Sequence, residues 1–283
     1  MKALISDIHG NFEALKRVCA DIEDHRADQI LCLGDIVGYG PEPEACADFI
    51  MQKAVITITG NHDFALIFGP IGFNPIAADL IRLTQTRMDP KKQDKHIAKE
   101  EKKAPRYFPC CREGQDPACM IMRHKTPERW KFIENLPQTH QDGDLLYVHG
   151  SVLEPVFEYV FPDKFQDLWD TRRLGAMFAK IDRLCFCGHT HHPCAITDDF
   201  RCIYPEQTGY RLVLDPARKY ILNLGSVGQP RDGDNRACYL LFDEKTNTAE
   251  WRRVEYDIEA TVTKVEAMCG GGNWCGERLR AGR

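Results

Sequence analysis

The sequence lacks long hydrophobic runs and the pattern of an export signal. No part of its 283 residues approaches the roughly 20 consecutive apolar residues that a membrane-spanning helix needs. The N-terminal segment MKALISDIHGN has only a short apolar run, which meets Asp7 and His9 directly, unlike a signal peptide. We therefore expect a cytoplasmic protein without a membrane partner.

The sequence also lacks a basic stripe and a disulfide framework. Its formal net charge is −5 with both signs mixed along the chain, which disfavours a general nucleic-acid binder. The 13 cysteines are odd in number, so they cannot all pair, and we expect mostly free thiols in a reducing compartment. No internal repeat is visible, and nothing indicates an oligomeric state. Hydrophobic residues make up 43% of the chain, enough for a sizeable core.

The first part of the chain alternates between strand-like and helix-like segments. Apolar runs at residues 3–6, 29–33 and 54–59 are predicted strands, and the β-branched third run is typical of a buried strand. Residues 11–25 and 42–52 show apolar side chains at helical spacing. This order predicts a sheet flanked by helices with right-handed crossovers.

The pattern changes in the second half. Residues 145–148 and 184–187 are predicted strands, with a helix at 165–181 between them. After residue 195, short apolar runs separated by turn residues predict antiparallel strands, followed by a last helix at 258–268. The predicted antiparallel strands are residues 211–214, 220–224, 237–242 and 250–254.

Two segments interrupt this organisation. Residues 88–125 are dense in charge and poor in aliphatic side chains, which predicts a mobile insertion within a single domain of residues 1–268. We propose that this insertion could act as a lid over the site predicted below. Residues 269–283 form a glycine-rich, basic tail that we expect to be disordered.

Five blocks of metal-type residues each follow a predicted strand. In α/β sheets, ligands bind at the carboxyl ends of the strands, so blocks distributed in this way can converge on one site. The blocks are Asp7-Ile8-His9, Gly34-Asp35, Gly60-Asn61-His62-Asp63, His149-Gly150 and Gly188-His189-Thr190-His191.

The ligand types in these blocks point to a metal centre. Carboxylate, amide and imidazole groups give mixed oxygen and nitrogen donors, which suit manganese, iron or zinc. A lone carboxylate after a strand, such as Asp35, can bridge two cations. Two neighbouring metal ions can clamp the attacking and leaving oxygens of a displacement at phosphorus. The blocks therefore favour phosphoester chemistry.

The five-block order resembles the calcineurin-like metallophosphoesterase family. The resemblance covers nearly the whole chain except the insertion and the tail. It implies an α/β (α+β) fold, a four-layer α/β/β/α sandwich of two mixed sheets flanked by helices. It also implies a dinuclear metal centre with a bridging hydroxide as the nucleophile.

The resemblance assigns a role to each position that matches the motif. His62 resembles the general acid that protonates the leaving oxygen, and Asp63 would orient and charge-stabilise it. The metal ligands would be Asp7, His9 and His191 for the first ion, Asn61, His149 and His189 for the second, and Asp35 as the bridge.

A sixth block, N-L-G-S-V-G-Q-P-R, begins at Asn223 and ends at Arg231. It is similar to the N-P-G-S-V-G-Q-P-R loop of a bacterial and archaeal branch, with Leu224 in place of proline. Arg231 could contact a substrate phosphate, because a guanidinium pairs well with phosphate oxygens. The alternative is that Arg231 pairs with Asp232 or Asp234, and the sequence leaves both open.

Departures within the motifs narrow the range of expected substrates. Protein Ser/Thr phosphatases carry G-D-x-V-D-R-G, and symmetrical dinucleoside tetraphosphate hydrolases carry a similar block with arginine. Here the block continues as Gly38-Tyr39-Gly40, without that arginine. The chain looks closer to the small prokaryotic phosphodiesterase-like branch, so we expect a phosphodiesterase or phosphomonoesterase acting on a small-molecule phosphoester.

Several alternatives remain open. A protein Ser/Thr phosphatase or a dinucleoside polyphosphate hydrolase would use the same centre, and a nuclease is disfavoured by the acidic balance. A non-catalytic interaction scaffold on the same fold is a rival of another class. His192 could reach the substrate or lie at the periphery. A structural zinc site would need Cys110, Cys111, Cys119 and His124, whose spacing matches no standard zinc motif.

Overall fold

The computed structural model describes residues 1–92, 117–161, 168–269 and 274–283. Its strands form two six-stranded sheets, each containing parallel and antiparallel pairs. Within these described ranges, no helix combines the length and the apolar character needed to cross a bilayer.

The first sheet joins the predicted N-terminal strands to the C-terminal ones. Its order is β3-β2-β1-β11-β12-β9, and β1, β2 and β3 are parallel. Strand β11 pairs antiparallel with both β1 and β12. The strands are β1 (Lys2–Ile5), β2 (Gln29–Cys32), β3 (Ile56–Thr57), β9 (Arg211–Val213), β11 (Ala237–Asp243) and β12 (Thr248–Val254).

The second sheet has the order β4-β5-β6-β10-β7-β8. Strands β5, β6 and β10 are parallel, and the outer strands pair antiparallel. The strands are β4 (Thr139–Asp142), β5 (Leu145–Val148), β6 (Leu184–Cys187), β7 (Cys194–Thr197), β8 (Cys202–Ile203) and β10 (Tyr220–Asn223).

The two sheets pack face to face over a buried core. Alternate side chains of each strand enter it, because successive residues of a strand point to opposite faces. Leu4 and Leu240 come from the first sheet, and Phe186 and Leu222 from the second. Trp251 fills the same layer and donates its indole N–H to the carbonyl of Asn223, 2.8 Å away. This bond ties the two sheets together next to the sixth sequence block.

Helices cover the outer faces of both sheets. Side chains of the first sheet that point away from the shared core, such as Ile5 and Leu241, pack with Val18 and Ile50 of α1 and α2. On the second sheet, Leu174 of α7 packs in the same way. The helices are α1 (Phe12–Asp24), α2 (Pro43–Lys53), α3 (Asn61–Phe68), α4 (Pro75–Met88), α6 (Pro117–Glu134), α7 (Leu168–Phe178), α8 (Ile258–Met268) and α9 (Trp274–Ala281).

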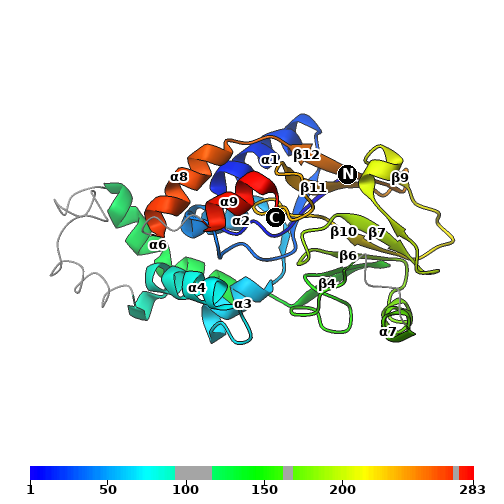
Figure 1. The fold of residues 1–283 in the computed structure, drawn as a ribbon, viewed down its shortest axis with the longest axis horizontal. Helices are drawn as coiled ribbons and strands as arrows, with labels where there is room; N and C mark the ends of the chain where they lie inside the picture. Colours follow the sequence, from blue (N-terminus) through cyan, green and yellow to red (C-terminus); the bar gives the residue numbers. More distant parts are fainter. Residues whose placement is uncertain (93–116, 162–167, 270–273) are drawn as a thin grey trace.

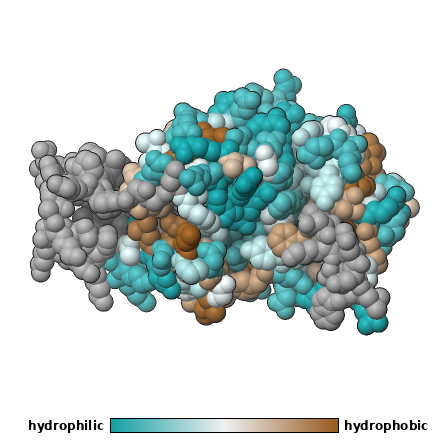
Figure 2. All heavy atoms as spheres, in the orientation of Figure 1, coloured by the Kyte–Doolittle hydropathy of each residue, from teal (hydrophilic) through white to brown (hydrophobic). Residues whose placement is uncertain are grey.

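This arrangement confirms the predicted four-layer α/β/β/α sandwich (Figure 1). Helices α3, α4 and α6 gather at one end of the molecule. The face drawn in Figure 2 is mostly hydrophilic, with apolar patches over that end. Two of the exposed apolar residues are Phe68, the last residue of α3, and Ile71, in the loop after it, which are 61% and 84% exposed.

The prediction of a disordered tail is wrong for its last ten residues. Helix α9 (Trp274–Ala281) packs against α8, with Cys275 and Leu279 buried. Arg280 of α9 pairs with Glu259 of α8 at 2.7 Å. The glycine-rich composition suggested disorder, but these tertiary contacts order the helix.

Two other predictions need comment. The strand predicted at residues 54–59 is only the two-residue β3, half-buried at the edge of the first sheet. Most of the predicted 88–125 insertion lies outside the described residues, and α6 begins at Pro117. The domain boundaries and the lid hypothesis therefore stay predictions.

Candidate metal centre

The strand-end blocks converge on one buried site between the two sheets. Blocks one and two follow the parallel neighbours β1 and β2, and blocks four and five follow the parallel neighbours β5 and β6. The third block forms the first turn of α3. The seven predicted ligands are each no more than 7% exposed: Asp7, His9, Asp35, Asn61, His149, His189 and His191.

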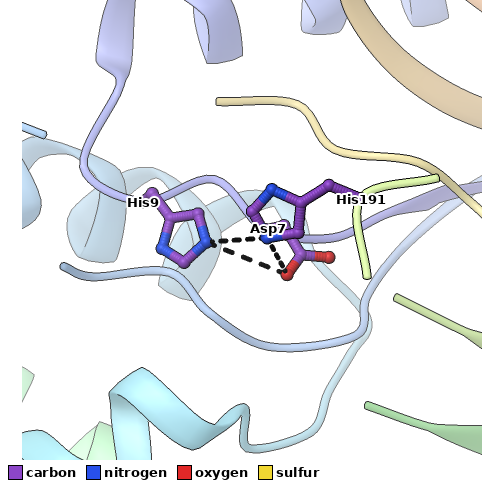
Figure 3. Close-up of side chains that lie close together, drawn as sticks. All are labelled: Asp7, His9 and His191. Atoms are coloured by element: carbon purple, nitrogen blue, oxygen red, sulfur yellow. Dashed lines mark hydrogen bonds and ion pairs between the residues drawn. The ribbon is translucent and has the colours of Figure 1, made fainter. Parts of the chain in front are cut away.

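Asp7, His9 and His191 form the first group (Figure 3). The Nε2 atoms of His9 and His191 are 3.2 Å apart, and Nε2 of His191 is 3.0 Å from Oδ1 of Asp7. Nε2 of His9 lies 3.9 Å from the same carboxylate oxygen. The three side chains thus direct one atom each toward a common point.

The other ring nitrogens determine which atoms carry lone pairs. Nδ1 of His9 lies 3.2 Å from the carbonyl of Val37, and Nδ1 of His191 lies beside the carbonyl of Gln229. A carbonyl only accepts, so each Nδ1 must donate its proton and each neutral Nε2 then carries a lone pair. Oδ1 of Asp7 is buried without a hydrogen-bond partner. Its 3.0 Å contact with His191 is therefore a contact between two acceptors, which repel unless a cation lies between them.

His149 and His189 are fixed in the same way. Nδ1 of His149 donates to the carbonyl of Leu33 at 2.8 Å, and Nε2 of His189 donates to the carbonyl of Phe157 at 3.1 Å. The remaining nitrogens, Nε2 of His149 and Nδ1 of His189, face each other at 3.2 Å. When both rings are neutral, two lone pairs meet here in a buried position.

Oxygen ligands complete this second group. Oδ1 of Asn61 lies 3.1 Å from Nε2 of His149, and Oδ2 of Asp35 lies 3.4 Å from the same nitrogen. Oδ2 of Asp35 is also 3.6 Å from Nε2 of His9, so this carboxylate stands between the two groups. Ligands about 2.0–2.2 Å from a shared metal lie roughly 3 Å apart, so these separations fit metal binding.

The backbone at the site is conformationally unusual. Asp7, His9, Asp35, His189 and His191 all have φ between 50° and 66°, in the left-handed region that non-glycine residues seldom adopt. Such conformations persist where the surrounding structure enforces them, and they cluster at functional sites. Half of the ten non-glycine residues with positive φ in the described chain are predicted ligands.

Glycines allow the ligand loops to approach closely. A Cβ on Gly60 would lie 2.1 Å from Oδ1 of Asp35, and one on Gly188 would lie 2.4 Å from Oδ2 of Asp7. Both distances are far below van der Waals contact, so any side chain here would displace a predicted ligand.

Burial and nearby carboxylates set the pKa values of the histidines. Burial lowers the pKa of His9 well below its ordinary value and that of His189 to about 3. Burial also acts to lower the pKa of His149, but the charges of Asp35 and Asp7 outweigh it and raise this pKa to about 9. The carboxylates therefore favour a cation at this position, either a proton on His149 or a metal ion.

Comparison with known proteins decides the family. A family model described as a calcineurin-like phosphoesterase superfamily domain matches residues 1–247. The chain belongs to this superfamily. The predicted resemblance is confirmed, and family membership identifies this metallophosphoesterase as a hydrolase of phosphoesters.

Two relatives match the metallophosphoesterase over its full length. A protein of Methanocaldococcus jannaschii described as uncharacterized is 33% identical over 294 residues, covering 100% of this chain and 98% of the relative. The crystal structure of a metallophosphoesterase from Sphaerobacter thermophilus is 32% identical, with a TM-score of 0.73 and coverage of 100% of this chain and 98% of that one. A symmetrical bis(5′-nucleosyl)-tetraphosphatase of Nitrosococcus oceani is 33% identical over 75 residues, covering 25% of this chain and 27% of that protein.

His62 lies at the edge of the metallophosphoesterase centre. Its backbone N–H donates to Oδ1 of Asp35 at 2.8 Å, and its Nδ1 is buried without a hydrogen-bond partner. The ring packs against His9, Tyr39 and Phe73, with centroids 4.7–4.8 Å away. Burial lowers its pKa to about 4, against the opposing charge of Asp35.

The predicted contact between Asp63 and His62 is wrong. Neighbouring residues on a helix do not face each other, and these two occupy the first turn of α3. The Asp63 carboxylate instead accepts from the backbone N–H groups of Ile36 at 3.0 Å, Val37 at 3.3 Å and Gly60 at 3.1 Å. Asp63 therefore fixes the loop that carries Asp35.

The sixth block supports the ligand loops. The side chain of Asn223 donates to the carbonyl of Gly188 at 2.6 Å and to Oγ1 of Thr190 at 3.0 Å, within the fifth block. The hydroxyl of Ser226 donates to the carbonyl of Asp7 at 2.8 Å, and the carbonyl of Gln229 accepts from His191. These supporting contacts were not predicted from the sequence, although the block itself was noted.

Arg231 extends from this block beside the centre. Its guanidinium donates to Oε1 of Gln229 at 2.8 Å and lies 5.8 Å from the Tyr39 ring. Asp232 pairs with Arg253, and Asp234 with Arg236 and Arg253. The alternative in which Arg231 pairs with either aspartate is therefore not what the structure shows.

Aromatic residues around the centre were also missed by the sequence analysis. Tyr159 stacks on His189 with centroids 3.7 Å apart and remains 47% exposed.

His192 lines an open cavity of about 290 Å³ together with Tyr204, Arg231 and others. The four residues of the suggested zinc site lie outside the part of the chain whose side chains are described.

Proposed function

We propose that the protein hydrolyses small-molecule phosphoesters with a dinuclear metal centre. The observation that carries the proposal is the convergence of seven buried acceptor atoms in two groups, with the Asp35 carboxylate shared between them. Unpaired acceptors facing each other in a buried site are costly unless a cation compensates them. Two groups with one bridging carboxylate match two neighbouring metal ions.

The donor set favours manganese, iron or zinc. The first ion would be held by Asp7, His9 and His191, and the second by Asn61, His149 and His189. Four imidazoles are more than magnesium or calcium usually accept, because those ions prefer oxygen ligands. When bound, such ions would neutralise phosphate charge and lower the pKa of a water nucleophile.

His62 would transfer a proton to the leaving oxygen. Its ring lies beside two predicted ligands, with one ligand-type atom each of His62, His9 and Asp35 within 4.8 Å of one another, and it is held between aromatic neighbours. An arriving phosphate anion would raise the pKa of His62, because an opposite charge stabilises the protonated ring. The protonated ring would then act as the general acid.

Arg231 would hold an oxygen of the scissile phosphate. Gln229 accepts from its guanidinium through the side chain and from His191 through the carbonyl, so one residue positions both groups. Within the described chain, Arg231 has no carboxylate partner that would compete with a phosphate. A guanidinium in this state is suited to bind phosphate oxygens.

Phosphodiesters are the preferred substrates in this proposal, with phosphomonoesters as the second choice. Hydrolysis of dinucleoside polyphosphates is another candidate, supported by the local similarity to the tetraphosphatase of N. oceani. Symmetrical dinucleoside tetraphosphate hydrolases and protein Ser/Thr phosphatases carry an arginine where this chain has Tyr39. The missing arginine weighs against dinucleoside polyphosphate hydrolysis and against protein phosphatase activity.

Metal reconstitution tests the proposal. Metal-free protein loaded separately with manganese, iron or zinc is assayed on bis-p-nitrophenyl phosphate, p-nitrophenyl phosphate, a dinucleoside tetraphosphate and DNA. We expect about two metal ions per chain and the highest kcat/KM on the diester. His149→Ala should lose metal, whereas His25→Gln at the end of α1 should keep it. Full metal loading without turnover of any substrate would instead support the non-catalytic scaffold.

A further inference from the structure

A cavity of about 290 Å³ adjoins the metal centre on the side of His191. His192 of its lining directly follows this ligand in the chain. Arg231, also in the lining, donates to the side chain of Gln229, whose carbonyl accepts from His191. The cavity is therefore continuous with the loops that position the first ligand group. Its lining residues come from three separate segments: His192, Pro193, Tyr204, Glu206, Arg231 and Asp232.

Aromatic rings contribute to the walls of this cavity. Tyr204 packs on the hydrophobic cluster under α7, and the ring of His192 meets the ring of Phe161 edge-on, with centroids 6.2 Å apart. The 3₁₀ helix η2 (Pro205–Thr208) starts directly after Tyr204 and carries Glu206. An aromatic residue and a carboxylate residue two positions apart therefore line the same cavity.

The two carboxylates of the lining differ in how their charges are compensated. Asp232 pairs with the guanidinium of Arg253, a side chain that is only 3% exposed. Glu206 is exposed and accepts from the hydroxyl of Tyr210 at 3.3 Å, and no lysine, arginine or histidine of the described ranges forms an ion pair with it. The cavity therefore carries one uncompensated negative charge, on Glu206, and one uncompensated positive charge, on Arg231.

Opposite charges in one cavity suit a substrate that also carries both charges. In the proposed function, Arg231 holds an oxygen of the scissile phosphate. An ester group that extends from this phosphate into the cavity would meet the aromatic wall and the carboxylate of Glu206. A cation is favoured there, because both a carboxylate and the face of an aromatic ring attract positive charge. An anionic ester group would be repelled by the same carboxylate.

We propose that this cavity binds the alcohol half of a phosphodiester formed with an amino alcohol, and that Glu206 and Tyr204 hold its ammonium group. The inference rests on the proposed hydrolytic function and narrows its substrates to zwitterionic diesters. Arg231 would hold the phosphate, and Glu206 would distinguish the charge of the ester group. Glu206 is then a specificity-determining residue that takes no part in the chemistry at phosphorus.

Two phosphate esters of the same shape isolate the effect of this charge. Phosphocholine carries a trimethylammonium group, and 3,3-dimethylbutyl phosphate has a neutral tert-butyl group in its place. Isothermal titration calorimetry in manganese-containing buffer, at one fixed ionic strength, measures the Kd of each ester. The wild-type protein should bind phosphocholine about five- to tenfold more tightly, because an exposed ion pair and a cation–π contact each strengthen binding a few-fold.

Two glutamates offer a matched pair of variants. Glu206→Gln keeps the shape of the side chain but removes its charge, so the preference for phosphocholine should fall to about twofold. Tyr204→Leu removes the ring and should also reduce the preference. The control is Glu255→Gln, because Glu255 is likewise exposed but lines a separate cavity with Asn235 and Tyr256. It removes the same charge from the protein and should keep the full preference.

The outcomes separate this inference from the catalytic proposal. Equal affinity of the wild-type protein for the two esters, or an unchanged preference in Glu206→Gln, would overturn the ammonium subsite. Hydrolysis of bis-p-nitrophenyl phosphate by the same wild-type preparation tests the catalytic proposal independently. Active protein without a preference for phosphocholine would leave hydrolysis intact and remove only the subsite, whereas a preference without turnover of any diester would overturn the hydrolytic function instead.

Discussion

Asn223 gives the sharpest test of how the sixth block supports the metal centre. Asn223 is 2% exposed, and its side chain bonds four buried groups. Its amide donates to the carbonyl of Gly188 at 2.6 Å and to Oγ1 of Thr190 at 3.0 Å, and its Oδ1 accepts from the N–H of Gly225 at 2.9 Å. The amide also contacts Sγ of Cys187 at 3.7 Å, and Asn223→Ala removes all four interactions at once.

The expected cost follows from these partners. A buried polar group left without a partner costs about 1–3 kcal/mol, and Oγ1 of Thr190 still accepts from the backbone N–H of His192 at 3.3 Å. We therefore expect Asn223→Ala to lower the free energy of unfolding by about 3 kcal/mol. The loop of Gly188 and Thr190 also carries His189 and His191, so metal affinity should fall by about 10–100-fold, as when other supporting hydrogen bonds are lost.

Urea unfolding of metal-free protein measures the first effect, and competition with a chelator measures the second. The control is Asn135→Ala, because Asn135 is exposed and, among the described residues, its side-chain amide bonds only the carbonyl of Lys131. That variant should stay within about 0.5 kcal/mol of the wild type. If Asn223→Ala were as stable as the control and bound metal normally, the supporting role of the block would be refuted.

Three further predictions concern the centre itself. His62→Ala should lower kcat about 10²–10⁴-fold for esters with poor leaving groups while keeping bound metal, as metal analysis and kinetics on leaving groups of different pKa would show; metal loss in this variant would contradict it. Gly188→Ala should destabilise the protein by about 1–3 kcal/mol in thermal unfolding, because its Cβ would lie 2.4 Å from Asp7; an unchanged Tm would contradict the close approach. In metal-free protein at pH 7 the ring of His149 is protonated, since its pKa is raised to about 9, so metal binding should release protons, and calorimetry in buffers of different ionisation enthalpy should detect them.

Much of the fold was predictable because its strands are short apolar runs with clear boundaries. The runs at residues 145–148 and 184–187 coincide with β5 and β6. Strands β7 and β8 were not predicted: β7 begins only three residues after His191 of the fifth block, and β8 has only two residues. Helix α9 was missed because its order comes from contacts with α8 rather than from local composition.

The metal ligands were predictable for a different reason. They lie in compact blocks at strand ends, and parallel neighbouring strands bring such blocks to one edge. The groups that act around the ligands are dispersed. Tyr39 and Arg231 come from two separate segments, and no spacing in the sequence relates them. Asp63 shows the same limit, because only the helical geometry of α3 reveals that it faces away from His62.

The backbone carbonyls around the centre explain why its geometry suits metal ions rather than an internal hydrogen-bond network. Each of the four histidines donates one ring proton to a carbonyl, so the opposite nitrogen of a neutral ring is left as an acceptor. If the rings instead took the other tautomer, a bare ring nitrogen would face each carbonyl, and those buried carbonyls would lose their donors. The strained ligand loops would then lose the hydrogen bonds that hold them. The fold therefore turns these four nitrogens inward before any ion binds, and a proton on His149 or a metal ion supplies the cation that their lone pairs and the carboxylates favour.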